Sequence, residues 1–266
     1  QESGCRKILL PWCQIDDAVL AGFPNPIDLL EKNRHSVFMN EPSQLLYFGD
    51  PMCSWCYGFA PVLLRLKEDL EGRLPIHCVL GGLRPGPHAE KMDEKLKRFL
   101  RHHWEEVHRT TGQEFGYKIF DRDDFVYDTE PSCRAVAIVR KLKPDAVIDF
   151  FAQVQTAFYR DSKDTTMLET YIPLAAEIGV SPEEFTALWN SEDMKAETWK
   201  DFEFAASAGV RGFPTLIYIG EGRGQIICRG YLPYEDVRER VETVLTARKP
   251  VLAPTQEACD IEKGIC

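Results

Sequence analysis

The sequence predicts an α/β fold in which a small sheet domain is interrupted by an inserted all-helical domain. Three observations indicate this class: a strand–helix–strand pattern between residues 44 and 80, helical patterns from 87 to 208, and two strands with a helix after residue 209. The resulting order is β-α-β, then helices, then β-β-α. It is typical of one sheet domain split by a helical insertion.

The first three elements are short and closely spaced. Residues 44–49 (QLLYFG) form an apolar run that ends at a Gly-Asp-Pro turn, which predicts a buried strand. Residues 59–70 place apolar side chains every three or four positions and stop before Gly72, which predicts a helix. Residues 75–80 (PIHCVL) predict a second strand. A strand–helix–strand unit of this length favours two parallel strands.

The predicted insertion is a succession of amphipathic helices. Apolar side chains recur at helical spacing between residues 92 and 107, and Ser181 with Glu184 forms a capping box that has Pro182 at the first helical position. Further helices are expected over residues 131–143, 145–160, 166–178 and 191–208.

The chain then returns to the sheet. Residues 215–219 (TLIYI) and 225–228 (QIIC) are β-rich runs separated by a glycine-bounded turn, which predicts a hairpin. A last amphipathic helix is expected over residues 233–247. Residues 1–43 are interpreted as an N-terminal appendage and residues 249–266 as a C-terminal tail with two cysteines.

Composition and charge exclude several classes of function. The 266 residues carry 42 Asp and Glu against 32 Lys and Arg, a formal charge of −10. This acidity argues against a general nucleic-acid binder, because phosphate contacts need clustered basic side chains. No apolar run approaches the roughly 18 residues of a membrane span. No signal-peptide segment is visible in the first residues, which favours the cytoplasm.

The motif Cys53-Ser54-Trp55-Cys56 follows the first predicted strand and opens the next helix. Free N–H groups and the helix dipole favour an anion at that position, so Cys53 is placed to act as a thiolate nucleophile. Cys56, one turn further, is suited to attack a mixed disulfide and release a bound substrate. The alternative is half of a four-cysteine zinc site. No second motif of that kind is present, and we predict no metal.

A second motif, Gly-Val-Arg-Gly-Phe-Pro-Thr, ends at Thr215 directly before a predicted strand. A cis Pro214 would turn the backbone of Phe213 outward, free to pair with an extended substrate peptide. The simpler reading of these residues is a trans proline that marks a strand edge.

These residues resemble the DsbA-like branch of the thioredoxin fold. The run D-P-M-C-S-W-C-Y-G-F, the helical insertion and G-V-R-G-F-P-T carry the resemblance, and Gly81-Gly82-Leu83-Arg84-Pro85-Gly86 is similar to FrnE-like members. The resemblance implies a thioredoxin-like domain over residues 44–86 and 209–248, with the helical domain inserted over residues 87–208.

The resemblance also implies an activity and its residues. Such proteins are thiol–disulfide oxidoreductases that need no further cofactor, with Cys53 attacking and Cys56 resolving. Pro214 matches the family's cis proline beside the dithiol, against the simpler trans reading. The side chains that would contact substrate are Ser54, Trp55, Phe213 and Thr215. The Ser-Trp dipeptide departs from the dipeptides of strong oxidants and of reductants, which leaves the direction of electron flow open.

Several residues have two readings. Asp50 is a candidate proton shuttle or a turn residue paired with Pro51. The Gly81–Gly86 segment contacts glutathione or a peptide, or is a simple turn. We expect three further cysteines to be buried, unreactive thiols: Cys78, Cys133 and Cys228. The remaining four form accessory disulfides or are unpaired terminal thiols: Cys5, Cys13, Cys259 and Cys266.

Three functions follow, in order of preference. The first is a thiol–disulfide oxidoreductase or isomerase that acts on protein or small-thiol disulfides, with glutathione as a candidate partner. The second is a glutathione-dependent enzyme similar to kappa-class transferases and 2-hydroxychromene-2-carboxylate isomerases, although these usually have a serine at the position of Cys53. The third is a non-catalytic adaptor of the same fold. Paired tail cysteines would move the expected compartment to the periplasm or the exterior.

Overall fold

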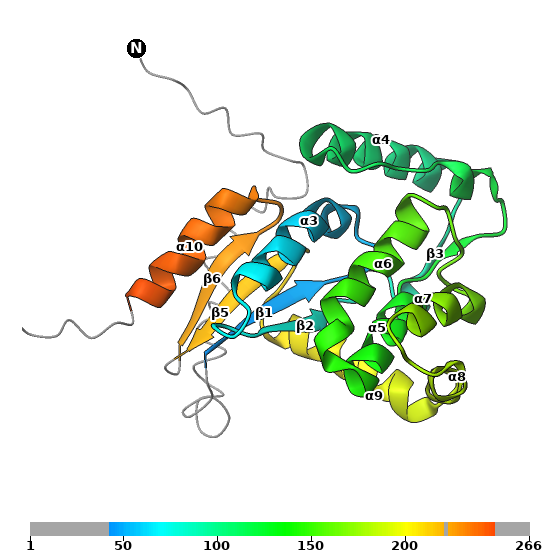
Figure 1. Ribbon diagram of the computed structural model, residues 1–266. Helices are drawn as coiled ribbons and strands as arrows, with labels where there is room; N and C mark the ends of the chain where they lie inside the picture. The colour runs from blue at the N-terminus through cyan, green and yellow to red at the C-terminus, as the bar shows by residue number, and fades with distance from the viewer. Residues whose placement is uncertain (1–42, 221–222, 248–266) are drawn as a thin grey trace, which may run out of the picture.

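The computed structural model describes residues 43–220 and 223–247 (Figure 1). A four-stranded sheet of order β2-β1-β5-β6 forms its centre. The strands are β1 (Gln44–Gly49), β2 (Ile76–Leu80), β5 (Thr215–Gly220) and β6 (Arg223–Arg229). β1 pairs in parallel with β2 and antiparallel with β5, and β5 pairs antiparallel with β6. The predicted parallel unit and the predicted hairpin are both confirmed.

Helices cover both faces of the sheet. α3 (Ser54–Asp69) and α10 (Tyr234–Thr246) lie on one face, and α9 (Glu192–Ser207) lies on the other (Figure 1). Side chains alternate along β1: Leu45 and Tyr47 belong to the core under α3, whereas Leu46 and Phe48 belong to the core against α9. The near-continuous apolar run of β1 is therefore that of a strand buried on both faces.

The insertion between β2 and β5 is mainly helical, as predicted. Its longest helix, α4 (Glu94–Thr111), covers a cluster of aromatic side chains around the buried Trp104. The other helices of the insertion are α5 (Glu130–Leu142), α6 (Val147–Tyr159), α7 (Tyr171–Glu177) and α8 (Pro182–Trp189), followed by α9. Short 3-10 turns cover Gly86–His88, Lys118–Asp121, Pro144–Ala146 and Leu168–Thr170.

Local side-chain chemistry explains where prediction and structure differ. The Ser181 hydroxyl accepts from the Glu184 N–H at 3.3 Å, which confirms the predicted cap of α8. α7 begins at Tyr171 rather than at Thr166, because the Asp164 carboxylate binds the Thr166 N–H and hydroxyl in a turn. The two-residue strands β3 (Glu90–Lys91) and β4 (Val126–Tyr127) were not predicted, since such short segments show no periodicity.

The domain boundaries given above stay a prediction. α9, inside the range 87–208, packs on the sheet through Ala205, against Phe48 and Ile217. The appendage expected at 1–43 and the tail expected at 249–266 lie outside the described residues, apart from Ser43. Among the helices of the described part, none is long and apolar enough to cross a membrane.

Candidate active site

Cys53 stands at the entrance of α3. β1 ends at Gly49, a turn follows, and Cys53 occupies the N-cap position, where its N–H donates to the Asp50 carbonyl at 3.0 Å and its own carbonyl accepts from the Tyr57 N–H at 3.0 Å. The free N–H groups of a helix start favour a thiolate at this position. Cys53 is 6% exposed and Cys56 is fully buried. An incoming disulfide can therefore reach Cys53 before Cys56.

The second predicted motif lies against the first. The Phe213–Pro214 peptide bond is cis, and the Cys53 Sγ lies 3.5 Å from the Phe213 carbonyl oxygen across 160 positions of sequence. Pro214 and Thr215 are buried, and the Thr215 hydroxyl donates to the Gly212 carbonyl at 2.8 Å. The trans reading of Pro214 is therefore wrong, and the reading implied by the family resemblance is correct.

Cys56 is the better shielded of the two thiols. Burial raises the pKa of Cys56 well above its usual range, and the neighbouring Cys53 raises it further. The two residues between the cysteines are half-buried, and the ring of Trp55 lies 6.3 Å from that of Tyr231. Tyr231 was not among the predicted site residues. It follows β6 in a loop that no motif marked.

Gly81 and Gly82, in the loop after β2, leave room for the rings of Phe213 and Phe202. A Cβ at Gly81 would lie 2.1 Å from the ring of Phe213, and at Gly82, where φ is +63°, it would lie 2.7 Å from the ring of Phe202. The Gly81 N–H also donates to the Gly49 carbonyl at 2.8 Å. The glycine pair thus has a packing role, because only hydrogen atoms leave room for the rings. A contact with glutathione or a peptide stays a prediction.

Asp50 is fully buried and has several partners. Its Oδ1 accepts from the Met52 N–H at 2.8 Å, and its Oδ2 accepts from the Leu83 N–H at 2.6 Å and from the Cys133 thiol at 3.6 Å. Burial raises the pKa of Asp50, and these hydrogen bonds oppose the rise. The carboxyl group thus hydrogen-bonds to three segments: the turn before Cys53, residues 81–86 (the glycine loop) and α5. Its role as a proton shuttle stays a prediction.

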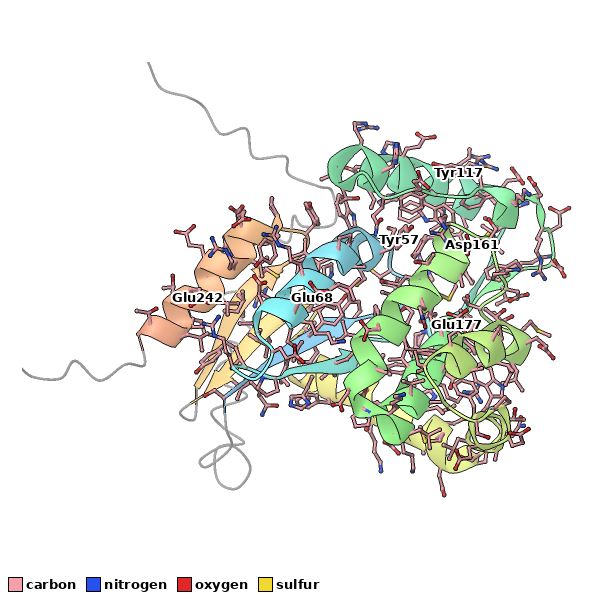
Figure 2. The ribbon with its side chains drawn as sticks, viewed as in Figure 1. Tyr57, Glu68, Tyr117, Asp161, Glu177 and Glu242 are labelled. Atoms are coloured by element: carbon pink, nitrogen blue, oxygen red, sulfur yellow. The ribbon has the colours of Figure 1, made fainter. Side chains whose placement is uncertain are left out.

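The insertion also holds the residue before Cys53. Met52 is fully buried, its carbonyl accepts from the Tyr127 hydroxyl, and its sulfur accepts from the Thr165 hydroxyl at 3.3 Å. In the same cluster, Tyr57 of α3 (labelled in Figure 2) stacks its ring on that of Tyr159 of α6, with the ring centroids 4.9 Å apart. Sequence reasoning missed Tyr127 and Thr165, because nothing in their local pattern links them to a turn more than seventy residues earlier.

The three cysteines that were expected to be buried, unreactive thiols are buried and free in the structure: Cys78, Cys133 and Cys228. Burial raises the pKa of Cys78 to about 12 and that of Cys228 to about 11, which keeps both protonated at neutral pH. Burial also raises the pKa of Cys133, and the nearby Asp50 adds to the effect. The contact of Cys133 with Asp50 was not foreseen. The accessory disulfides proposed for Cys5, Cys13, Cys259 and Cys266 lie outside the described residues.

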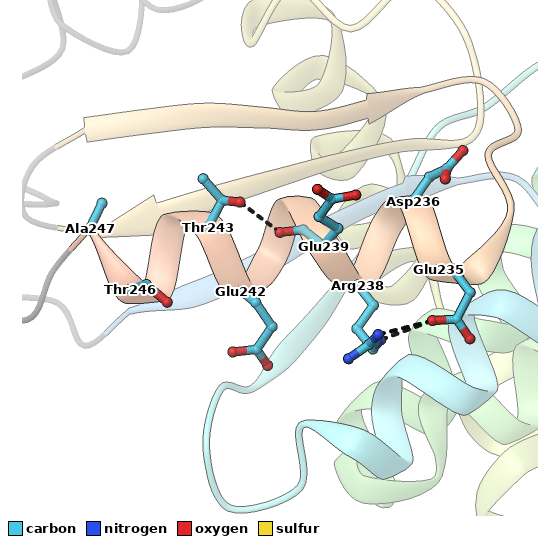
Figure 3. A pocket seen from close by; sticks show the side chains of 8 residues that line it. All are labelled: Glu235, Asp236, Arg238, Glu239, Glu242, Thr243, Thr246 and Ala247. Carbon is cyan, nitrogen blue, oxygen red and sulfur yellow. Dashed lines mark hydrogen bonds and ion pairs between the residues drawn. The ribbon is translucent and has the colours of Figure 1, made fainter.

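A hollow along α10 is lined by that helix and Ala247 (Figure 3), and two of its acids are in ion pairs: Glu235 with Arg65 and Arg238, and Glu242 with Arg73. In the described ranges, no group of three or more His, Cys, Asp or Glu side chains is arranged to hold a metal ion.

Comparisons with known proteins point to the same chemistry. A family model described as thioredoxin matches residues 46–235. A candidate protein disulfide isomerase from Nitrosomonas europaea is 34% identical, with a TM-score of 0.71 over 78% of this chain and all of that chain.

Two further relatives differ in their described roles. The cytosolic disulfide reductase DsbM from Pseudomonas aeruginosa is 26% identical, with a TM-score of 0.63 over 77% of this chain and 99% of that chain, and it has also been solved with GSH. The ClpXP adapter protein SpxH from Halalkalibacterium halodurans is 20% identical over 77% of this chain and 68% of its own length.

Proposed function

The chain belongs to the thioredoxin family, and from this we propose that it is a thiol–disulfide oxidoreductase of the DsbA-like group, using Cys53 and Cys56. The observation that carries the proposal is the contact between Cys53, at the start of α3, and the Phe213 carbonyl beside cis Pro214. It supports a site in which a nucleophilic sulfur adjoins backbone that an extended substrate can pair with.

The reaction has two exchange steps. The Cys53 thiolate attacks a substrate disulfide, forming a mixed disulfide and releasing one substrate thiolate. Cys56 then attacks Cys53, so that the enzyme disulfide forms and the second substrate thiolate leaves. The full burial of Cys56, against the 6% exposure of Cys53, supports this order, because substrate would reach Cys53 first. Trp55, Phe213 and Thr215, with Ser54, are proposed to border the bound substrate.

Reduction of insulin by the full chain in the presence of a small dithiol tests this function. Wild-type protein should accelerate insulin precipitation, and Cys53→Ser should reduce the rate to the uncatalysed level. Cys78→Ala, which removes a buried thiol on β2, is the matched control and should retain the wild-type rate. An equal rate for wild type and Cys53→Ser would contradict the proposal.

We propose protein disulfides and small-thiol disulfides, including that of glutathione, as substrates. The relative solved with GSH supports this class. The partly exposed ring of Trp55, next to that of Tyr231, offers an apolar border for peptide side chains. Titration of the Cys53–Cys56 pair against glutathione buffers measures the potential of the pair, and from it the direction of electron flow.

A second candidate function is that of an adaptor, which the relationship to an adapter protein favours. An adaptor would bind its client through the surface of the fold and would retain that binding in Cys53→Ser, with no loss of client turnover. The kappa-transferase-like alternative has less support, since Cys53 stands where those enzymes usually have serine. Conjugation of glutathione to an electrophile by the Cys53→Ser variant would favour it.

We propose the cytoplasm as the compartment. Three buried cysteines are free thiols, which suits a reducing environment, and one relative is described as cytosolic. A non-reducing disulfide map of the protein isolated from cells tests this: paired tail cysteines would instead indicate an oxidising compartment.

A further inference from the structure

Tyr47 lies at the centre of the sheet, directly beneath α3. It is fully buried, its ring stacks on Phe59 of α3 at 6.1 Å, and Phe151 of α6 meets it edge-on at 5.7 Å. Its hydroxyl is buried and has no hydrogen-bond partner among the described residues. A buried hydroxyl without a partner is destabilising, so packing alone does not explain a tyrosine here.

The hydroxyl points toward the dithiol end of β1. A Cβ built at Gly49, two residues further along the same face, would lie 2.6 Å from the Tyr47 ring and 2.8 Å from its hydroxyl oxygen. The ring therefore leans along the strand, over Gly49, to the end of β1 where the turn leads into α3. Cys56 lies in the first turn of that helix.

The groups that face this hydroxyl are mainly thiols. Its electrostatic neighbours are Cys56 in the first turn of α3, Cys78 on β2 and Cys53 at the N-cap of α3. In the sheet, Tyr47 lies between Cys78 of β2 and Leu216 of β5, and Phe151 of α6 contacts its ring. Burial raises the pKa of Tyr47, and the neighbouring Cys56 raises it further. Burial also raises the pKa of Cys56, and the Tyr47 hydroxyl opposes that rise. In the resting dithiol the contact does not have hydrogen-bond geometry. The hydroxyl proton is thus available when Cys56 becomes an anion.

We propose that the Tyr47 hydroxyl donates a hydrogen bond to the thiolate of Cys56 and stabilises it during the resolving step. This inference rests on the proposed function. It gives a specific role to a buried hydroxyl group that otherwise destabilises the core. Such a local cost in stability is expected at a functional site.

The Cys56 thiol gives its proton to solvent, and Tyr47, which keeps its own proton, donates a hydrogen bond to the thiolate that remains. The thiolate attacks the Cys53 sulfur, the Cys53–Cys56 bond forms, and the bond between Cys53 and the substrate sulfur breaks. The substrate leaves as a thiolate and takes a proton from solvent. The dithiol is oxidised by two electrons and the substrate disulfide is reduced by two.

Tyr218 provides a matched control. It is a buried tyrosine on the same face of the adjacent strand β5, and a Cβ at Gly220 would lie 2.3 Å from its hydroxyl oxygen. Because β5 runs antiparallel to β1, this hydroxyl lies at the opposite end of the sheet, where it donates to Ser43. Tyr218→Phe removes a comparable hydroxyl without touching the dithiol.

The test follows the two release steps separately. Reduced protein is mixed rapidly with dithiobis(nitrobenzoate): attack by Cys53 releases one coloured thiolate, and attack by Cys56 releases the second. In Tyr47→Phe we expect the second phase to be roughly tenfold slower at neutral pH, with its pH midpoint about one pH unit higher, and the first phase unchanged. Tyr218→Phe should match wild type in both phases. Tyr47→Phe should also unfold at an equal or higher urea concentration, since it loses an unpaired hydroxyl.

A second variant tests the direction in which the pH midpoint of the second phase moves. Fluorotyrosine at position 47, which keeps the hydroxyl and makes it a stronger donor, should move the midpoint of the second phase to lower pH. A wild-type second phase and midpoint in Tyr47→Phe would overturn the inference. A wild-type protein that shows the first phase without the second would instead contradict the proposed function.

Discussion

The sheet part of the molecule and the helical insertion contribute differently to one site. The sheet part holds the two cysteines of the proposed reaction, Cys53 at the N-cap of α3 and Cys56 in its first turn, together with the Phe213 carbonyl that contacts Cys53. The insertion supplies no sulfur to the reaction, yet Tyr127 and Thr165 hold Met52, the residue next to Cys53. The insertion therefore does more than cover the dithiol, since it holds the turn that carries the proposed nucleophile Cys53.

Asp50 connects the two parts. Its carboxyl group binds Met52 within the turn, Leu83 in the glycine loop and Cys133 at the start of α5. Cys53 is the N-cap of α3 and Cys133 lies in the first turn of α5, but Cys53 is 6% exposed, whereas Cys133 is fully buried against the Asp50 carboxyl group. A helix start alone thus does not make a reactive cysteine. Exposure and the neighbouring charge decide it.

The largest effect should come from the sheet side. Gly81→Ala would place a Cβ 2.1 Å from the Phe213 ring, which has to move together with the carbonyl that contacts Cys53. We expect a loss of about 2–3 kcal/mol in unfolding free energy and at least roughly tenfold in insulin reduction. Urea unfolding and the reduction assay measure the two.

Gly212→Ala is the control for this substitution. Gly212 also adjoins Phe213, but a Cβ there has nothing within 4 Å. Its stability should stay within about 0.5 kcal/mol of wild type. Equal effects of the two substitutions would mean that the contact between Gly81 and Phe213 is not what holds the loop.

On the insertion side a smaller effect is expected. Tyr127→Phe leaves the buried Met52 carbonyl without its donor, at a cost of about 1–2 kcal/mol in unfolding free energy and a few-fold in the Cys53 attack rate. Stopped-flow release of the first thiolate measures that rate. Tyr117→Phe, in a half-buried ring of the same aromatic cluster, should leave it unchanged. An unchanged rate in Tyr127→Phe would limit the insertion to a covering role.

The smallest effect concerns pH. Burial raises the pKa of Asp50 in the folded protein above 3.8, so the carboxyl group loses its proton at a lower pH in the unfolded chain than in the folded one. Its contribution to stability therefore falls as the pH rises from the unfolded pKa to the folded pKa. In Asp50→Asn this fall should be absent. Urea unfolding from about pH 4 to about pH 7 measures it, with the exposed Asp145→Asn as control. A pH profile in Asp50→Asn that equals wild type would show that Asp50 does not titrate in this range.

Much of the site could be predicted from local pattern. The strand, turn and helix around Cys53 follow from apolar spacing and from the Gly-Asp-Pro turn, and the two cysteines are ordered by their place on the helix. The geometry of Pro214 could not be derived in this way, since local preference favours trans, and only the resemblance to a family gave the correct answer. Tyr47 was predicted as part of a buried strand and nothing more.

Local sequence patterns were enough to predict the longer helices, the four strands of the central sheet, the dithiol at a helix start and the class of fold, because periodicity, caps and motif spacing depend on neighbours within a few turns of chain. The distant groups that surround the dithiol follow from tertiary packing instead: Phe213 at Cys53, Tyr127 at Met52, Cys133 at Asp50, and Tyr47 near Cys56. These contacts depend on how the insertion packs against the sheet and on how two glycines let rings approach the backbone. Packing of that kind leaves no periodic signal along the chain.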